Sequence, residues 1–477
     1  MATISKRAFC ILLSLALLLT FASCKKDKTA EGEVTTAETT GYTVSEKNPQ
    51  GAEIKEKEIT SGDYVYTLYS DGNATVNRYL GDSKVLTVPA EIDLHPVTAV
   101  GGNAFSGNTV LEEVTVPAGA ELERYAFCAA KALKTVKLED EFTEIPEGCF
   151  ADCEALESVA LPGTVKKVGD GGFYNCVSMS DIELSQLESI GSYAFAYSGI
   201  TDAVLSEKLT YLGESAFHGC RYLKSASLPD SLHGIPANLF TSCVLLSDVS
   251  FSDELKTIGA YAFYGCYNLP EITIPAGVTV ISEYAFGECG KLSEVSIPEG
   301  ITEIGRAAFY NCTGIGEITL PESLKKIGAY AFAYCTGLSE MKIPDGVEEI
   351  ESYAFADCTS MEKINIPKSV TVLAEYVFAG CSKVETFELH ENIAVVGPCA
   401  FYECKGVREL RIPDGVENFG IAAFAGMKSL EKLYYYGDAD GIPDYLFDGT
   451  ENVTVYCKKG SEMAKFVKEN DIKYTEE

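Results

Sequence analysis

The sequence has few basic residues and few histidines. Lys and Arg total 38 of the 477 residues against 70 Asp and Glu, which gives a formal net charge of −32. This charge repels a phosphate backbone, so we expect no nucleic-acid partner. The chain has no Cys-x-x-Cys pair, and its only histidines are scattered, at His95, His218, His233 and His390. We therefore expect no metal site.

The sequence also lacks the short motifs of common catalytic and nucleotide-binding sites. It contains no His-Glu-x-x-His, no Gly-x-Ser-x-Gly, no P-loop, no Gly-x-Gly-x-x-Gly and no EF-hand loop. Each of these motifs supplies a nucleophile, a metal ligand or a phosphate cradle. We therefore expect a non-enzymatic protein with no catalytic residue and no cofactor.

The first residues predict export. Lys6 and Arg7 precede an apolar run at 8–19 that is typical of a secretory signal peptide. The small residues at 22–23 directly before Cys24 resemble the bacterial lipobox. This resemblance implies a signal peptide at 1–23, cleavage before Cys24 and lipid attachment to that cysteine, which would anchor the chain at the bacterial cell surface or outer membrane. The alternative is a cysteine that merely follows a signal peptide.

The next segment, 24–60, is rich in Thr, Glu and Lys and has few apolar residues. Such a composition cannot bury enough apolar surface to offset the entropy lost on folding. We predict a disordered tether here.

The rest of the chain repeats itself. Sixteen phenylalanines recur at intervals of 22 or 23 residues, at positions 105, 127, 150, 173, 195, 217, 240, 263, 286, 309, 332, 355, 378, 401, 424 and 447. A period in this range is typical of a solenoid, in which each turn buries its apolar face by stacking on its neighbours.

Residues 286–309 show the whole repeat unit, F-x-x-C-x-x-L-x-x-I-x-I-P-x-x-V-x-x-I-G-x-x-A. Residues 292–298 alternate apolar and polar residues and end at a proline, which indicates a short half-buried strand. The Gly or Pro four residues before most of these phenylalanines suits the start of a short helical turn. The sequence therefore predicts an α/β repeat solenoid of stacked short parallel strands and short helical turns, with 22–23 residues per turn.

The solenoid is predicted to span 101–450, with a cap at each end. Asp71 and Gly72 form a hairpin signal within an alternating segment, so we expect an N-terminal β cap at 61–100. Residues 451–477 suggest a strand followed by an amphipathic helix from about Ser461 to Glu469 as a C-terminal cap.

Cysteine occupies one position of the repeat again and again. Eleven cysteines follow the repeat phenylalanine by three residues, at 153, 176, 220, 243, 266, 289, 312, 335, 358, 381 and 404. Metal binding and disulfides are the alternatives to simple packing. Adjacent turns lie about 5 Å apart, wider than the usual Cβ separation of a disulfide, so we predict buried thiols that act as small hydrophobes.

The repeat resembles the BspA-like (Treponema-type) leucine-rich repeat, and the resemblance covers about residues 62–477. It implies a bacterial surface protein that binds other proteins, often host matrix components, in adhesion or aggregation. It brings no catalytic motif.

Two columns of side chains are candidate binding surfaces. One holds five successive acidic residues at outward strand positions, Asp248, Glu271, Glu294, Glu317 and Glu340. Like charges in a row do not stabilise a sheet, so the column predicts a surface for a basic protein partner; the alternative is the solvated face of an acidic protein.

The second column holds tyrosines two residues before the repeat phenylalanine, including Tyr261, Tyr284, Tyr330, Tyr353 and Tyr376. If exposed, they would form an alternative, glycan-binding face. They are equally typical of partly buried side chains that pack beside the core.

Overall fold

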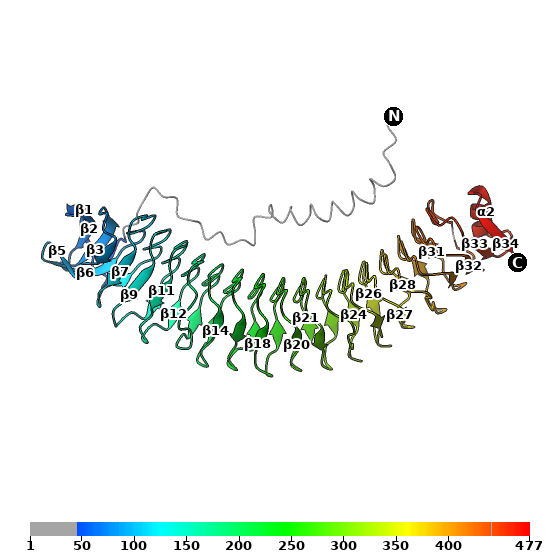
Figure 1. Ribbon diagram of the computed structural model, residues 1–477, viewed down its shortest axis with the longest axis horizontal. Helices are drawn as coiled ribbons and strands as arrows, with labels where there is room; N and C mark the ends of the chain where they lie inside the picture. The colour runs from blue at the N-terminus through cyan, green and yellow to red at the C-terminus, as the bar shows by residue number, and fades with distance from the viewer. Residues whose placement is uncertain (1–44, 440) are drawn as a thin grey trace, which may run out of the picture. The chain divides into compact units, whose positions relative to one another are not determined.

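The computed structural model describes residues 45–439 and 441–477. The predicted signal peptide, Cys24 and most of the predicted tether lie outside these residues. The described chain is a β-solenoid, in which each turn, or rung, runs from one repeat phenylalanine to the next (Figure 1). Within this part of the chain, no helix is both long and apolar enough to cross a membrane.

The described chain begins with a small sheet. Strands β1 (Ile54–Ser61), β2 (Tyr64–Tyr69) and β3 (Ala74–Tyr79) pair antiparallel, and β3 pairs parallel with β6 (His95–Val100). A short strand, β5 (Glu91–Ile92), also pairs with β6. The predicted hairpin at Asp71 and Gly72 joins β2 to β3. The predicted boundary of the tether is wrong, because residues 54–60 belong to β1.

The rungs build two columns of parallel strands. The first column follows the predicted strand position and comprises β4 (Val85–Thr87), β7 (Glu113–Val116), β9 (Thr135–Leu138), β11 (Ser158–Ala160), β14 (Asp202–Val204), β16 (Ser225–Ser227), β18 (Asp248–Ser250), β20 (Glu271–Thr273), β22 (Glu294–Ser296), β25 (Glu340–Met341), β27 (Lys363–Ile364), β30 (Glu409–Arg411), β32 (Lys432–Tyr435) and β33 (Thr454–Cys457). Apolar residues of these strands point into the core and polar ones point outward, as the alternation predicts.

The second column was not predicted. It comprises β8 (Glu121–Leu122), β10 (Glu144–Ile145), β12 (Lys167–Val168), β13 (Ser189–Ile190), β15 (Tyr211–Leu212), β17 (Gly234–Ile235), β19 (Thr257–Ile258), β21 (Val280–Ile281), β23 (Glu303–Ile304), β24 (Lys326–Ile327), β26 (Glu349–Ile350), β28 (Val372–Leu373), β29 (Val395–Val396) and β31 (Asn418–Phe419). The first residue of each strand points outward, and the second is buried in the core.

The predicted short helical turns are wrong. In every rung the residues two before and two after the repeat phenylalanine have positive φ, for example Tyr261 at 58° and Gly265 at 72° around Phe263. This alternation of left-handed and right-handed residues is incompatible with a helix, and it points every second N–H group toward the next rung. The N–H groups of Tyr261, Phe263 and Gly265 donate to carbonyls of the next rung at 2.8–3.0 Å. The segment is therefore a third ladder between rungs.

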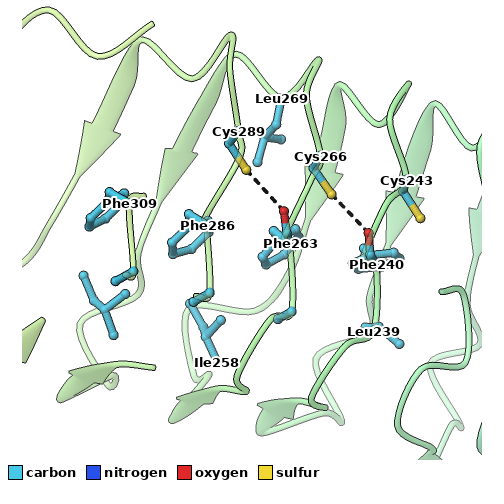
Figure 2. Packing of buried hydrophobic residues seen from close by; sticks show 14 of the residues in the cluster. Leu239, Phe240, Cys243, Ile258, Phe263, Cys266, Leu269, Phe286, Cys289 and Phe309 are labelled. Atoms are coloured by element: carbon cyan, nitrogen blue, oxygen red, sulfur yellow. Dashed lines mark hydrogen bonds between the residues drawn. The ribbon is translucent and has the colours of Figure 1, made fainter. Parts of the chain in front are cut away.

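The phenylalanines form one continuous stack through the core. Neighbouring rings lie 4.8–6.0 Å apart and stack in all fifteen steps from Phe105 to Phe447. Figure 2 shows the part of this stack from Phe240 to Phe309. The stack continues to Tyr79 at one end, at 5.3 Å, and to Phe466 at the other, at 6.5 Å. Both end segments therefore share the core of the solenoid.

The C-terminal segment contains the predicted helix. Helix α2 (Glu462–Glu469) begins after Ser461, whose hydroxyl accepts the N–H of Ala464, and it buries Met463, Ala464 and Val467. It is followed by strand β34 (Lys473–Glu476), which was not predicted and pairs parallel with β33.

Candidate binding surfaces

The acidic column is present on the surface of the solenoid. All five of its side chains are exposed, and register pairs place Glu271 beside Glu294 and Glu317 beside Glu340. Within the described chain, none of the five is in an ion pair, whereas Lys167 pairs with Glu144 at 3.0 Å in the second strand column. The column therefore presents uncompensated negative charge.

An open depression of about 490 Å³ runs along this column. It is lined by Glu271, Glu294, Glu317 and Glu340, with short hydroxyl side chains such as Thr273 and one basic residue, Lys342, beside them. The sheet of the first column is interrupted here, because β22 ends one sheet and β25 begins another. Stacked like charges destabilise strand pairing, so the acidic residues do not help to hold these rungs together.

The tyrosine column is mostly stacked on itself. The ring centroids of Tyr261 and Tyr284 lie 4.8 Å apart, and Tyr330, Tyr353 and Tyr376 follow each other at 4.6 Å, all in stacked geometry. Tyr284 is buried and the other four are half-buried. Recognition of a sugar ring by stacking needs an open aromatic face, and here many of the faces are covered by neighbouring rings. This geometry weighs against the glycan-binding alternative.

The cysteine column is buried, as predicted, but it does more than fill space. Each of the eleven thiols lies 3.0–3.2 Å from the phenylalanine carbonyl oxygen of the preceding rung, to which it donates a hydrogen bond. Figure 2 shows two of these bonds, from Cys266 and Cys289. In the last rung Thr450 takes the same position, and its hydroxyl donates to the Phe424 carbonyl at 2.7 Å.

None of the eleven thiols forms a disulfide, and burial raises the pKa of Cys335 to about 12. A thiol ligates metal as the thiolate, so burial in an apolar core opposes metal binding. No group of three or more His, Cys, Asp or Glu residues within the described ranges is placed to hold a metal ion.

A strip of exposed apolar side chains was missed by the sequence analysis. Its members follow the repeat phenylalanine by four or five residues and are 37–58% exposed: Val177, Tyr222, Val244, Leu245 and Tyr267. The rungs that follow, from Phe286 to Phe424, carry Gly, Lys, Thr or Ser at these positions, so the sequence contained the signal. The strip leads directly into the acidic column, since Leu245 precedes Asp248 by three residues. A cluster of exposed apolar side chains is typical of an interaction site.

Rungs of 22 or 23 residues, strands stacked in register and a continuous phenylalanine stack define a leucine-rich repeat solenoid. The family model described as "BspA type Leucine rich repeat region" matches residues 90–198, 120–243, 188–316, 233–359 and 325–454. These matches together span most of the chain, so the protein belongs to the BspA-type leucine-rich repeat family, as the resemblance predicted.

The chain is similar to leucine-rich repeat proteins of known structure. A leucine-rich repeat protein from Bacteroides ovatus is 22% identical with a TM-score of 0.59, over 83% of this chain and 99% of that one. A leucine-rich cell surface protein from Faecalibacterium prausnitzii is 25% identical with a TM-score of 0.43, over 80% of this chain and 95% of that one. No curated protein matches the sequence.

Proposed function

We propose that the protein is a non-enzymatic, lipid-anchored surface protein that binds protein partners in adhesion. The observation that carries this proposal is the acidic column, in which Glu271 lies in register with Glu294 and Glu317 with Glu340, and whose carboxylates form no ion pair within the described chain. The family supports it, because its repeats build extended surfaces and bring no catalytic motif. The apolar strip beside the column supplies contact area.

The partner chemistry follows from the charge. Four carboxylates repeat at the strand spacing of about 4.8 Å, so a basic segment of a protein, such as a host matrix protein, fits along them. Such binding is steered by long-range attraction, and its association rate falls steeply with ionic strength. A glycan held by tyrosines would show little dependence on salt.

Changing Glu271, Glu294 and Glu317 together to Gln should weaken binding to a partner found on an array of matrix proteins and glycans. The substitution keeps side-chain shape and removes three charges from the column, so the association rate should fall and lose much of its dependence on salt. Surface plasmon resonance at several salt concentrations measures both effects.

The matched control changes Glu157, Glu207 and Glu417 to Gln, which alters net charge equally at exposed sites outside the acidic column. If the column variant binds as the control does, the column is only a solvated face. If the only partners found are glycans, and their binding does not depend on salt, the tyrosine column is instead the favoured binding surface.

Anchoring is tested at Cys24. Cys24→Ala should leave an unlipidated precursor that keeps its signal segment, because the residue that accepts the lipid is gone. Incorporation of labelled fatty acid, followed on gels, checks this against the unchanged chain. Fatty-acid incorporation into the variant would show that Cys24 is not the attachment site.

A further inference from the structure

Among the described residues, the first strand column ends in an open edge at β34. This strand is last in the sheet order β30-β32-β33-β34, and all four of its residues are exposed. Figure 1 places it beside the C-terminus, beyond β33. It pairs with β33 in regular register, with Thr454 opposite Lys473 and Cys457 opposite Glu476. Such an edge presents unpaired backbone groups to another chain.

Two backbone hydrogen bonds show which backbone groups face that edge. The N–H of Glu477 donates to the Cys457 carbonyl at 3.1 Å, and the Glu477 carbonyl accepts from the N–H of Lys459 at 3.3 Å. The backbone of Glu477 therefore faces β33. Backbone groups alternate sides along a strand, so the N–H and C=O groups of Tyr474 and Glu476 point to the open edge.

The side chains of the same segment also alternate. Lys473 and Thr475 share the outward face with their register partners Thr454 and Tyr456. The Glu477 carboxylate lies on this face too, because it accepts a hydrogen bond from the Tyr436 hydroxyl at 3.0 Å. The side chains on the outward face of the edge are therefore those of Lys473, Thr475 and Glu477.

We propose that β34 pairs antiparallel with β34 of a second copy of this chain, about a two-fold axis perpendicular to the sheet. With Thr475 opposite itself, Tyr474 lies opposite Glu476 of the second copy, and these are the residues whose backbone groups face the edge. The pairing forms four backbone hydrogen bonds. It also places Lys473 of each copy opposite Glu477 of the other, which gives two pairs of opposite charges. Opposite charges at such positions stabilise a sheet.

Charge complementarity selects this register and this occupant. The next two-fold register along the strand pairs Tyr474 with itself and places Ile472 opposite Glu476 of the second copy, which loses both ion pairs. The other strand edges are less suited to pairing. Strand β1 has two register shifts and a positive φ at Glu58, and bulges of this kind block strand addition. Strand β4 has only three residues.

Cross-linking tests the register directly. Thr475→Cys should give a disulfide-linked dimer under mild oxidation, because a residue opposite itself brings two Cβ atoms within about 5.5 Å. Lys473→Cys and Glu477→Cys should each dimerise poorly alone, and a mixture of the two should give the mixed dimer. The product is read on non-reducing gels after alkylation, with the unchanged chain as the blank.

Thr454→Cys, one strand inside the edge, is the matched control. The proposal is overturned if Thr475→Cys gives no more dimer than Thr454→Cys. It is also overturned if higher oligomers form without the Thr475→Cys dimer, because such a product indicates head-to-tail growth. Adding Lys473→Glu to Thr475→Cys should reduce cross-linking at least about fivefold, and further adding Glu477→Lys should restore it. Cross-linking indifferent to these charges would contradict the register. None of these outcomes depends on the acidic column.

Discussion

Phe286→Ala should lower the free energy of unfolding by about 3–5 kcal/mol, the range for truncating a buried aromatic side chain. The Phe286 ring is completely buried and stacks at 5.4 Å on Phe263 and at 5.6 Å on Phe309. Its removal takes a partner from both neighbouring rungs and leaves a cavity in a core that can collapse little, because three ladders fix the rung spacing. Urea unfolding followed by circular dichroism measures the change.

Tyr222→Ala is the control for this experiment. Tyr222 is 58% exposed and lies in the apolar strip, so its loss should change the unfolding free energy by no more than about 0.5 kcal/mol. Equal unfolding midpoints for the two variants would show that the phenylalanine stack does not hold the solenoid together.

The sequence predicted the features that depend on period. A phenylalanine every 22 or 23 residues requires stacked rungs, and the alternation at 292–298 places Val295 inward and Glu294 outward. The acidic column was predicted to be in register for the same reason, since parallel strands of equal rungs align equivalent residues. Whether a partner uses that column is a property of the partner as well, so the sequence alone could not decide it.

The second strand column was missed because it is short. Two residues such as Glu303 and Ile304 are too few for an alternating pattern to be recognised, and only stacking on neighbouring rungs makes them a strand. In this case tertiary packing, rather than local propensity, decides the structure.

The left-handed positions were missed for a different reason. Tyrosine dominates the position two before the phenylalanine, and it rarely adopts positive φ. The signal lay two residues after the phenylalanine, where six of the sixteen residues are glycine and four are Asn or Asp. These types accept a left-handed conformation at least cost. The rung-to-rung hydrogen bonds of this segment hold tyrosine in the same conformation.

The hydrogen bonds of the thiols were not predicted either, because the sequence pattern indicated only that the cysteines are small apolar residues of the core. This role predicts that Cys312→Val should lower the free energy of unfolding by about 1–3 kcal/mol, because valine keeps an apolar side chain but cannot donate. The Phe286 carbonyl, which accepts from the Cys312 thiol at 3.0 Å, would lose that bond inside the core.

Cys312→Ser should cost less than Cys312→Val, since a hydroxyl can donate to the same carbonyl, as Thr450 does in the last rung. If the thiol acts only as a small hydrophobe, we expect the opposite order of stability, with the serine variant less stable than the valine variant. Cys457 provides the matched control, because it is buried in β33 at an inward strand position outside the cysteine column. There valine should be tolerated better than serine. The two pairs of variants, compared by urea unfolding, therefore separate hydrogen bonding from apolar packing: the same order at both positions would show that the thiol column contributes packing alone.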